Sequence, residues 1–206
     1  MTTIYLIRHS KPLNVQNTYT SDSLQLQNEK KVLSLEGEEI AKEKFKSDIF
    51  NHINCVYSSN YTRAISTAKY VAEKNNVEIN IIDALGERKL GISSWDELPT
   101  GFERKQFLDE NYKIGNGESQ NEVRKRMSAT ILEILNENKN KTIAIFSHAT
   151  AISYLLKNWC NIEIIDDKLR YSFNEKIILH GHFNYCETFK LHFDDDNNLV
   201  NIENIK

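Results

Sequence analysis

Four short apolar runs constrain the fold of this chain more than any other feature of its sequence. They cover residues 4–7, 53–57, 79–82 and 142–146. Each run is almost continuously apolar, whereas a strand with one solvated face alternates apolar and polar residues. The runs are therefore typical of strands in a parallel sheet that is covered on both faces.

Stretches with helical signals separate these runs. They cover residues 34–45, 61–72, 119–135 and 149–159. In the third stretch, Ser119 and Glu122 have the spacing of a capping box, and apolar residues follow at helical intervals. The alternation of strands and helices predicts an α/β fold, a three-layer α/β/α sandwich with a mostly parallel central sheet and right-handed crossovers.

The length of 206 residues suits a single domain over residues 1–206. Residues 95–117 contain Pro99 and three glycines, and we expect a partly helical excursion that acts as a cap or specificity segment. Near the C-terminus, residues 183–193 and 199–205 flank a polar turn of aspartates and asparagines. This pattern predicts a hairpin that completes the sheet.

Charge and composition exclude several classes of protein. With 26 Lys and Arg against 29 Asp and Glu, the formal net charge is −3, which argues against a nucleic-acid binder with a basic face. The first apolar run reaches a charge at Arg8, so it predicts neither a signal peptide nor a membrane span. Three cysteines without paired spacing fit a reducing compartment, and we expect a cytoplasmic protein.

The polar residues that follow the predicted strands include two imidazoles, two guanidiniums and a carboxylate. Arg8 and His9 follow the first strand, Arg63 lies shortly after the second, Glu87 after the third, and His148 after the fourth. Ligand sites of open parallel sheets lie at the carboxyl ends of the strands. We therefore expect these five side chains to converge at one edge of the sheet.

Such a set of side chains suits phosphoryl transfer. Guanidiniums bind the oxygens of a phosphate in pairs, and a neutral imidazole can attack phosphorus to form a covalent intermediate. A nearby carboxyl group can protonate the departing alkoxide. Positioning and neutralisation of charge supply most of the remaining catalysis.

The segment Ile4-Tyr-Leu-Ile-Arg-His-Ser10 resembles the opening strand and Arg-His-Gly signature of the histidine phosphatase superfamily, the phosphoglycerate-mutase-like proteins. Further segments are similar to that family in the same order: Leu33-Ser-Leu-Glu-Gly-Glu-Glu-Ile-Ala41, Tyr57-Ser-Ser-Asn-Tyr-Thr-Arg-Ala-Ile-Ser-Thr-Ala68, Leu85-Gly-Glu-Arg-Lys-Leu-Gly91, Gly117-Glu-Ser119 and Phe146-Ser-His-Ala-Thr-Ala-Ile152. A single Arg-His pair is weak evidence, but several segments in order are specific.

The resemblance implies a phosphoglycerate-mutase-like fold and a role for each residue. His9 would be the phosphorylated nucleophile, and Arg8, Arg63 and His148, the last as an imidazolium, would bind the transferring phosphoryl group. Glu87 would protonate the leaving group and then activate water. The superfamily generally needs no metal, so the resemblance implies a cofactor-free hydrolase whose partner is a small-molecule phosphomonoester.

Two positions depart from the family pattern. Ser10 replaces the usual glycine, and its side chain is expected either to crowd the turn or to add a hydroxyl near the phosphate. Asn14 lies five residues after His9, one fewer than is usual for the asparagine of the signature. Ser10 and Asn14 are therefore candidate phosphate-binding residues on weaker grounds than the five residues above.

Two other functions fit parts of the sequence. A cofactor-dependent phosphoglycerate mutase is the first, but only 60 residues separate Glu87 from His148, where mutases carry a longer insertion. A non-catalytic phospho-ligand-binding protein is the second, but such members usually lose the nucleophile or an arginine. A metal site at His180, His182 and His192 is a weak signal without supporting carboxylates, so we expect no metal there.

Overall fold

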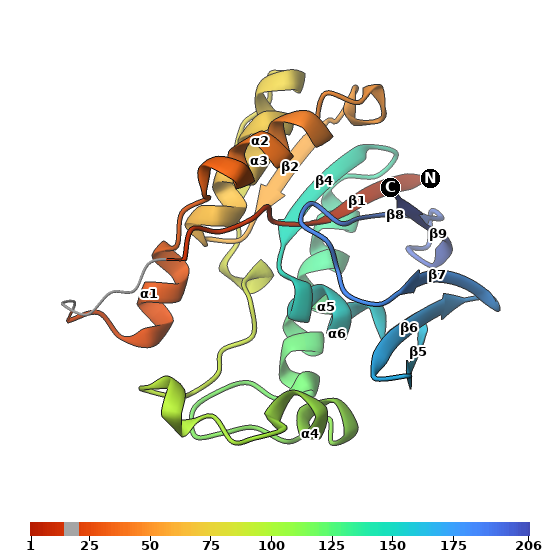
Figure 1. Ribbon diagram of the computed structural model, residues 1–206. Coiled ribbons are helices and arrows are strands. Elements are labelled where there is room, and N and C mark those ends of the chain that lie inside the picture. The colour runs from red at the N-terminus through yellow and green to blue at the C-terminus, as the bar shows by residue number, and fades with distance from the viewer. Residues whose placement is uncertain (15–20) are drawn as a thin grey trace.

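The central sheet of the computed structural model, which describes residues 1–14 and 21–206, has six strands in the order β3-β2-β4-β1-β8-β9 (Figure 1). The strands are β1 (Thr2–Arg8), β2 (Cys55–Ser58), β3 (Ile79–Ile81), β4 (Thr142–Ser147), β8 (Thr188–Phe193) and β9 (Leu199–Ile205). β1, β2, β3 and β4 pair in parallel, whereas β8 pairs antiparallel with β1 and β9. The predicted mostly parallel sheet and its C-terminal hairpin are confirmed.

Helices cover both faces of this sheet (Figure 1). The α-helices are α1 (Leu24–Lys30), α2 (Leu35–Lys44), α3 (Thr62–Asn75), α4 (Phe102–Leu108), α5 (Gln120–Glu137) and α6 (Ala149–Leu156), and the 3-10 helices are η1 (Asp48–Phe50), η2 (Asp83–Leu85) and η3 (Trp95–Glu97). α2 and α3 lie on one face, and α5 and α6 on the other. The architecture is therefore the expected three-layer sandwich.

Alternate residues of the strands pack into two separate cores, which explains why the runs are apolar throughout. In β1, Ile4 and Leu6 pack with α5 and α6, while Tyr5 and Ile7 pack with α2 and α3.

The capping box of α5 forms as predicted: Ser119 Oγ accepts from the Glu122 amide, and the Glu122 carboxylate accepts from the Ser119 amide.

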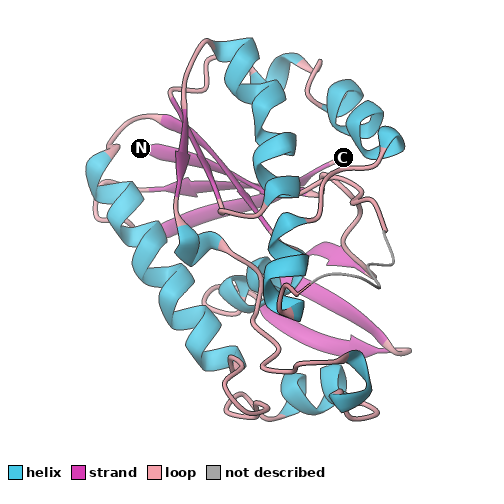
Figure 2. Ribbon diagram, turned by 90° about the vertical axis from the view of Figure 1, so that its left-hand side faces the viewer, coloured by secondary structure: helices cyan, strands magenta, loops and turns pink. Residues whose placement is uncertain are grey.

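A second, three-stranded antiparallel sheet lies beside the first (Figure 2). It consists of β5 (Asn161–Ile165), β6 (Lys168–Phe173) and β7 (Lys176–His180). Residues 95–117, the expected partly helical excursion, contain η3 and α4. α4 and the β5–β6 hairpin are linked by an ion pair between Arg104 and Asp167 of 3.3 Å.

None of the helices in the described part of the chain combines the length and apolarity that crossing a lipid bilayer requires.

Candidate active site

The carboxyl ends of β1, β2 and β4 bring four predicted site residues together. Arg8 ends β1 and His9 follows it, Arg63 lies in the first turn of α3, and His148 precedes α6. The rings of His9 and His148 lie 5.0 Å apart between centroids, and Arg63 hydrogen-bonds to both of them. The expected convergence of these groups at one sheet edge is therefore observed.

A hydrogen bond at each ring nitrogen fixes the orientation and the tautomer of His9. Its Nδ1 donates to the Ser10 carbonyl oxygen at 2.6 Å, and its Nε2 accepts from Arg63 Nε at 3.0 Å. The ring is almost completely buried. Burial, and then the charge of Arg63, hold the pKa of His9 well below its usual range. The ring is therefore neutral, and its lone pair lies on Nε2, the nitrogen that a nucleophile would use.

His148 is also neutral in this arrangement. Its Nδ1 lies 3.2 Å from Arg63 Nη2, which can only donate, so its Nε2 donates to Ser59 Oγ at 2.8 Å. Burial is the largest cause that holds the pKa of His148 well below its usual range, followed by the nearby His9 and Arg63. The expectation that His148 is an imidazolium does not fit these surroundings. The negative charge of a bound phosphate would favour its protonation.

Arg63 is enclosed from several sides. Its Nη1 donates to the Asn28 carbonyl oxygen of α1 at 2.5 Å, and its guanidinium lies 4.7 Å from the centre of the Tyr61 ring. Tyr61 in turn lies 4.4 Å from the His148 ring and accepts from Gln25. Burial raises the pKa of Tyr61 to about 12, so its hydroxyl is neutral. Its ring packs against the guanidinium of Arg63 and the imidazole of His148.

The guanidinium of Arg8 uses only part of its hydrogen-bonding capacity within the described part of the chain. Its Nη1 donates to the Phe183 carbonyl oxygen at 2.5 Å, and its guanidinium lies 4.7 Å from the centre of the Tyr185 ring. Its Nε is buried and makes no hydrogen bond among the described residues. A buried unsatisfied N–H is costly, and an anion beside it would remove the cost.

Glu87 lies between the site and the N-terminus of α6. One carboxylate oxygen accepts from the amides of Arg88 at 2.9 Å and Ala151 at 3.0 Å, and the other accepts from the Thr150 amide at 3.3 Å. Thr150 and Ala151 are the second and third residues after His148, so their amides hold the carboxylate close to that histidine. The structure therefore brings Glu87 next to the other four residues.

The two weaker candidates are placed differently. The Ser10 hydroxyl donates to the Gly37 carbonyl oxygen at 2.6 Å, so it anchors α2, and a phosphate contact by Ser10 stays a prediction. Asn14 is exposed, and its phosphate contact also stays a prediction.

Two hydroxyl groups have positioning roles that the sequence did not reveal. Ser59 orients His148, and Thr67 Oγ1 accepts from the Ser10 amide at 2.9 Å while donating to the Arg63 carbonyl oxygen. The position of Ser59 directly after β2 was the available signal, but a serine before a helix is more often a capping residue.

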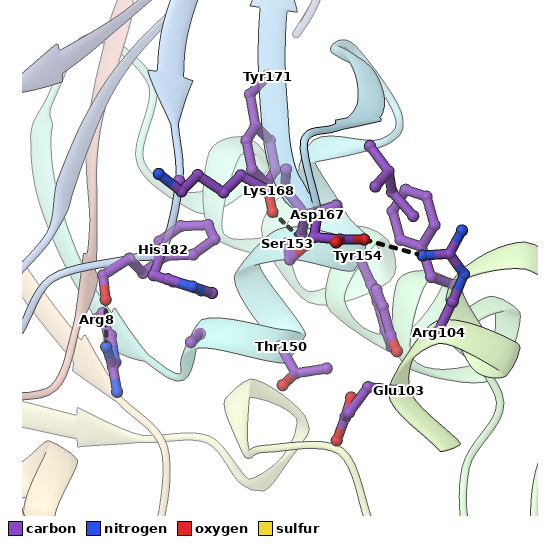
Figure 3. A pocket seen from close by; sticks show the side chains of 16 residues that line it. Arg8, Glu103, Arg104, Thr150, Ser153, Tyr154, Asp167, Lys168, Tyr171 and His182 are labelled. Atoms are coloured by element: carbon purple, nitrogen blue, oxygen red, sulfur yellow. Dashed lines mark hydrogen bonds and ion pairs between the residues drawn. The ribbon is translucent and has the colours of Figure 1, made fainter. Parts of the chain in front are cut away.

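A cavity of about 560 Å³ adjoins Arg8 and the start of α6 (Figure 3). Its lining includes Arg8 and Thr150, together with residues of α4, the β5–β6 hairpin and the loop after β7. The sequence predicts walls around the phosphate in residues 11–23 and 95–116, and α4 of the second segment lines the cavity. Residues 15–20 of the first segment lie outside the described part of the chain. The β5–β7 sheet adds a wall that the sequence did not predict.

Within the described residues, no group of three or more His, Cys, Asp or Glu side chains is arranged to hold a metal ion. His192 hydrogen-bonds instead to Thr3 on the neighbouring strand, at 3.1 Å.

Solved structures with the same fold cover nearly the whole chain. A mutant phosphoserine phosphatase from Entamoeba histolytica in complex with phosphoserine has a TM-score of 0.66, with 19% identity over 98% of this chain and 97% of that one. For a mycobacterial glucosyl-3-phosphoglycerate phosphatase the TM-score is 0.68, with 15% identity over 98% and 96%. For YhfR of Bacillus stearothermophilus the TM-score is 0.69, with 17% identity over 97% and 94%.

No curated protein matches the chain in sequence. The family model described as histidine phosphatase superfamily (branch 1) matches residues 4–190, which include Arg8, His9, Arg63, Glu87 and His148. With its three-layer fold and this match over most of its length, the chain belongs to branch 1 of the histidine phosphatase superfamily.

Proposed function

We propose that this protein is a phosphomonoester hydrolase that acts through a phosphohistidine on His9. The observation that carries the proposal is the state of His9: a buried neutral ring, anchored through Nδ1, with the lone pair of Nε2 directed at Arg63. An imidazole in this state can attack phosphorus without first losing a proton.

The two half-reactions balance with the residues at hand. In the first, His9 Nε2 forms a bond to phosphorus, the bond from phosphorus to the ester oxygen breaks, and Glu87 gives a proton to the departing oxygen. In the second, Glu87 takes a proton from water, the water oxygen attacks the phosphohistidine, and the bond from nitrogen to phosphorus breaks. Inorganic phosphate leaves, and His9 and Glu87 return to their starting states.

Arg8, Arg63 and His148 would stabilise the charge on the transferring oxygens. Arg63 already bridges both imidazoles, and Arg8 has a buried N–H without a partner among the described residues. Preorganised donors of this kind contribute more in a site closed to water than in solution. The neighbouring structures named as phosphatases support hydrolysis as the reaction class.

The proposal is tested with p-nitrophenyl phosphate in the absence of 2,3-bisphosphoglycerate. The native protein should hydrolyse the ester, and acid-free quenching should trap a phosphohistidine. His9→Ala should abolish both signals, whereas His180→Ala, at an exposed position of β7, should leave them unchanged.

Three results would overturn the proposal. Turnover by His9→Ala near the native rate would show that His9 is not the nucleophile. Activity that appears only with 2,3-bisphosphoglycerate and 3-phosphoglycerate would indicate a mutase. Failure of the native protein to form phosphohistidine with any ester would favour a non-catalytic binding protein.

A further inference from the structure

Apolar side chains from several elements form the walls of the 560 Å³ cavity beside Arg8 (Figure 3). They are Phe107 of α4, Tyr154 of α6, Ile164 of β5, Leu169 and Tyr171 of β6, and Phe183 after β7. Phe107 and Ile164 are half-buried and belong to neither core cluster of the described residues. Their apolar surface is therefore available to a ligand in the cavity.

Two tyrosines lie behind this wall: Tyr171 is fully buried and Tyr154 is 4% exposed. Tyr171 hydrogen-bonds through its hydroxyl to Ser153 at 2.7 Å, and Tyr154 donates to Gln106 at 2.9 Å. Burial raises the pKa of Tyr154 to about 12, so that hydroxyl stays protonated. With these polar ends engaged, the two buried rings are fixed in position, and they support the half-buried Phe107, Ile164, Leu169 and Phe183 that face the cavity.

Phe183 connects this wall to the phosphate end of the site. Its carbonyl oxygen accepts from Arg8 Nη1, and its ring packs edge-on against Tyr171, with centroids 5.5 Å apart. A phosphoryl group held by Arg8 would therefore lie next to the apolar wall.

The carboxylates around the cavity are already paired. Glu103 receives two hydrogen bonds from Arg88, and Asp167 is ion-paired with Arg104. Figure 3 shows Glu103, Arg104 and Asp167 on one side of the cavity and Arg8 with His182 on the other. The paired acids leave no isolated negative charge that would repel a phosphomonoester.

We propose that this cavity binds the leaving group of the substrate, and that this leaving group has a bulky, largely apolar body. The inference rests on the proposed hydrolase function and adds the substrate class. Cavities of this volume accommodate ligands of many non-hydrogen atoms. A three-carbon leaving group such as serine or glycerate would leave most of the apolar wall uncovered, and the gain from burying it would be lost.

The experiment compares 2-naphthyl phosphate with phenyl phosphate, because the two leaving groups have similar acidity and differ mainly in size. The native protein should show a kcat/KM about tenfold or more higher for the naphthyl ester. Phe107→Ala should reduce that ratio about tenfold. Leu108→Ala is the matched control, since Leu108 is the next residue of α4 and is 67% exposed.

A binding measurement separates this inference from the function on which it rests. His9→Ala, which lacks the nucleophile, should bind 2-naphthyl phosphate more tightly than phenyl phosphate in a fluorescence titration. Introducing Phe107→Ala into that protein should remove the difference.

The outcomes are distinct. Equal kcat/KM and equal affinity for the two esters, or a preference that survives Phe107→Ala, would overturn the apolar leaving-group site and leave the hydrolase function intact. Selective naphthyl binding in a native protein that hydrolyses neither ester would overturn the hydrolase function and support the site.

Discussion

Arg63 contacts both imidazoles of the site, so a single guanidinium has two effects. It holds the Nε2 atom of His9 by a hydrogen bond, and its charge lowers the pKa of both His9 and His148. Arg63 therefore adds to burial in keeping the proposed nucleophile neutral, and it also places a positive charge beside it. In the proposed reaction, the guanidinium would exchange its imidazole contacts for phosphoryl oxygens.

Arg63→Ala is expected to lower kcat/KM for p-nitrophenyl phosphate by about 100-fold or more, because it removes a preorganised donor from the developing negative charge. Steady-state kinetics measure this directly. Arg124→Ala is a suitable control, since Arg124 pairs with Glu110 on the outer side of α5. A native value in Arg63→Ala would place Arg63 outside the reacting site.

The acid limb of the profile of kcat/KM against pH should lie well below pH 6.5. His9 must be unprotonated to attack phosphorus, and burial together with Arg63 holds its pKa well below 6.5. After correction for the ionisation of the substrate phosphate near pH 6, kcat/KM should not fall between pH 8 and 6.5 through protonation of His9. Arg63→Ala removes one of the two main causes of the lowered His9 pKa, so the acid limb should move to higher pH. A native limb centred at or above pH 6.5 would contradict this account.

β1, β2 and β4 could be predicted from the sequence because they are buried on both faces and appear as continuous apolar runs. The edge strand β3 is partly exposed, but its isoleucines still indicated a strand. The first two residues after the first run supplied Arg8 and His9, and the second residue after the fourth run supplied His148. The β5–β7 sheet was not predicted, because its turns carry no glycine. Asp166-Asp167 and Asn174-Glu175 all have positive φ, from 47° to 66°, a conformation that these hairpin turns need and that glycine usually signals.

The position of α4 depends on one buried amide that no sequence pattern could reveal. Gln106 is fully buried, and its Oε1 accepts from Arg88 and Tyr154 while its Nε2 donates to the carbonyl oxygens of Tyr112 and Glu118. These bonds join α4 to the rest of the excursion and to α6. All of the hydrogen-bonding capacity of the amide is used.

Gln106→Leu should lower the free energy of unfolding by about 2–4 kcal/mol, because it takes the acceptor from the buried Tyr154 hydroxyl and the donor from the two carbonyl groups. Urea unfolding gives the loss, and hydrogen exchange should show residues 95–117 losing protection. Leu108→Ala, on the exposed side of the same helix, should change stability by less than about 0.5 kcal/mol. Equal effects of the two substitutions would show that the amide network does not hold α4.

At the scale of the whole molecule, folding buries two neutral imidazoles between the sheet and its helices. The arrangement suits a nucleophile, but it links stability to pH. Unfolding returns His9 and His148 to water, where their pKa is close to 6.5, whereas the folded pKa of each is well below that value. The unfolded chain therefore binds more protons than the folded chain just below pH 6.5.

It follows that the free energy of unfolding should be nearly constant from about pH 7 to 8 and fall as the pH drops below 6.5, by up to about 1.4 kcal/mol per pH unit for each ring. His192, whose pKa is lowered by burial, acts in the same direction. The carboxylates with lowered pKa, among them Glu38, Glu110, Glu118, Glu122 and Asp194, begin to lose their contribution within about one pH unit of their ordinary values of 4.5 and 3.8. The window from pH 5.5 to 6.5 is therefore the one in which the histidines dominate, and urea unfolding at pH 7.5, 6.5, 6.0 and 5.5 measures the slope. His148→Asn should reduce this slope by up to one proton, and His180→Asn should leave the slope unchanged.

The slope arises from burial and not from catalysis. A flat stability profile in the native protein would therefore mean that the two rings are open to water, and burial could then no longer explain a neutral His9.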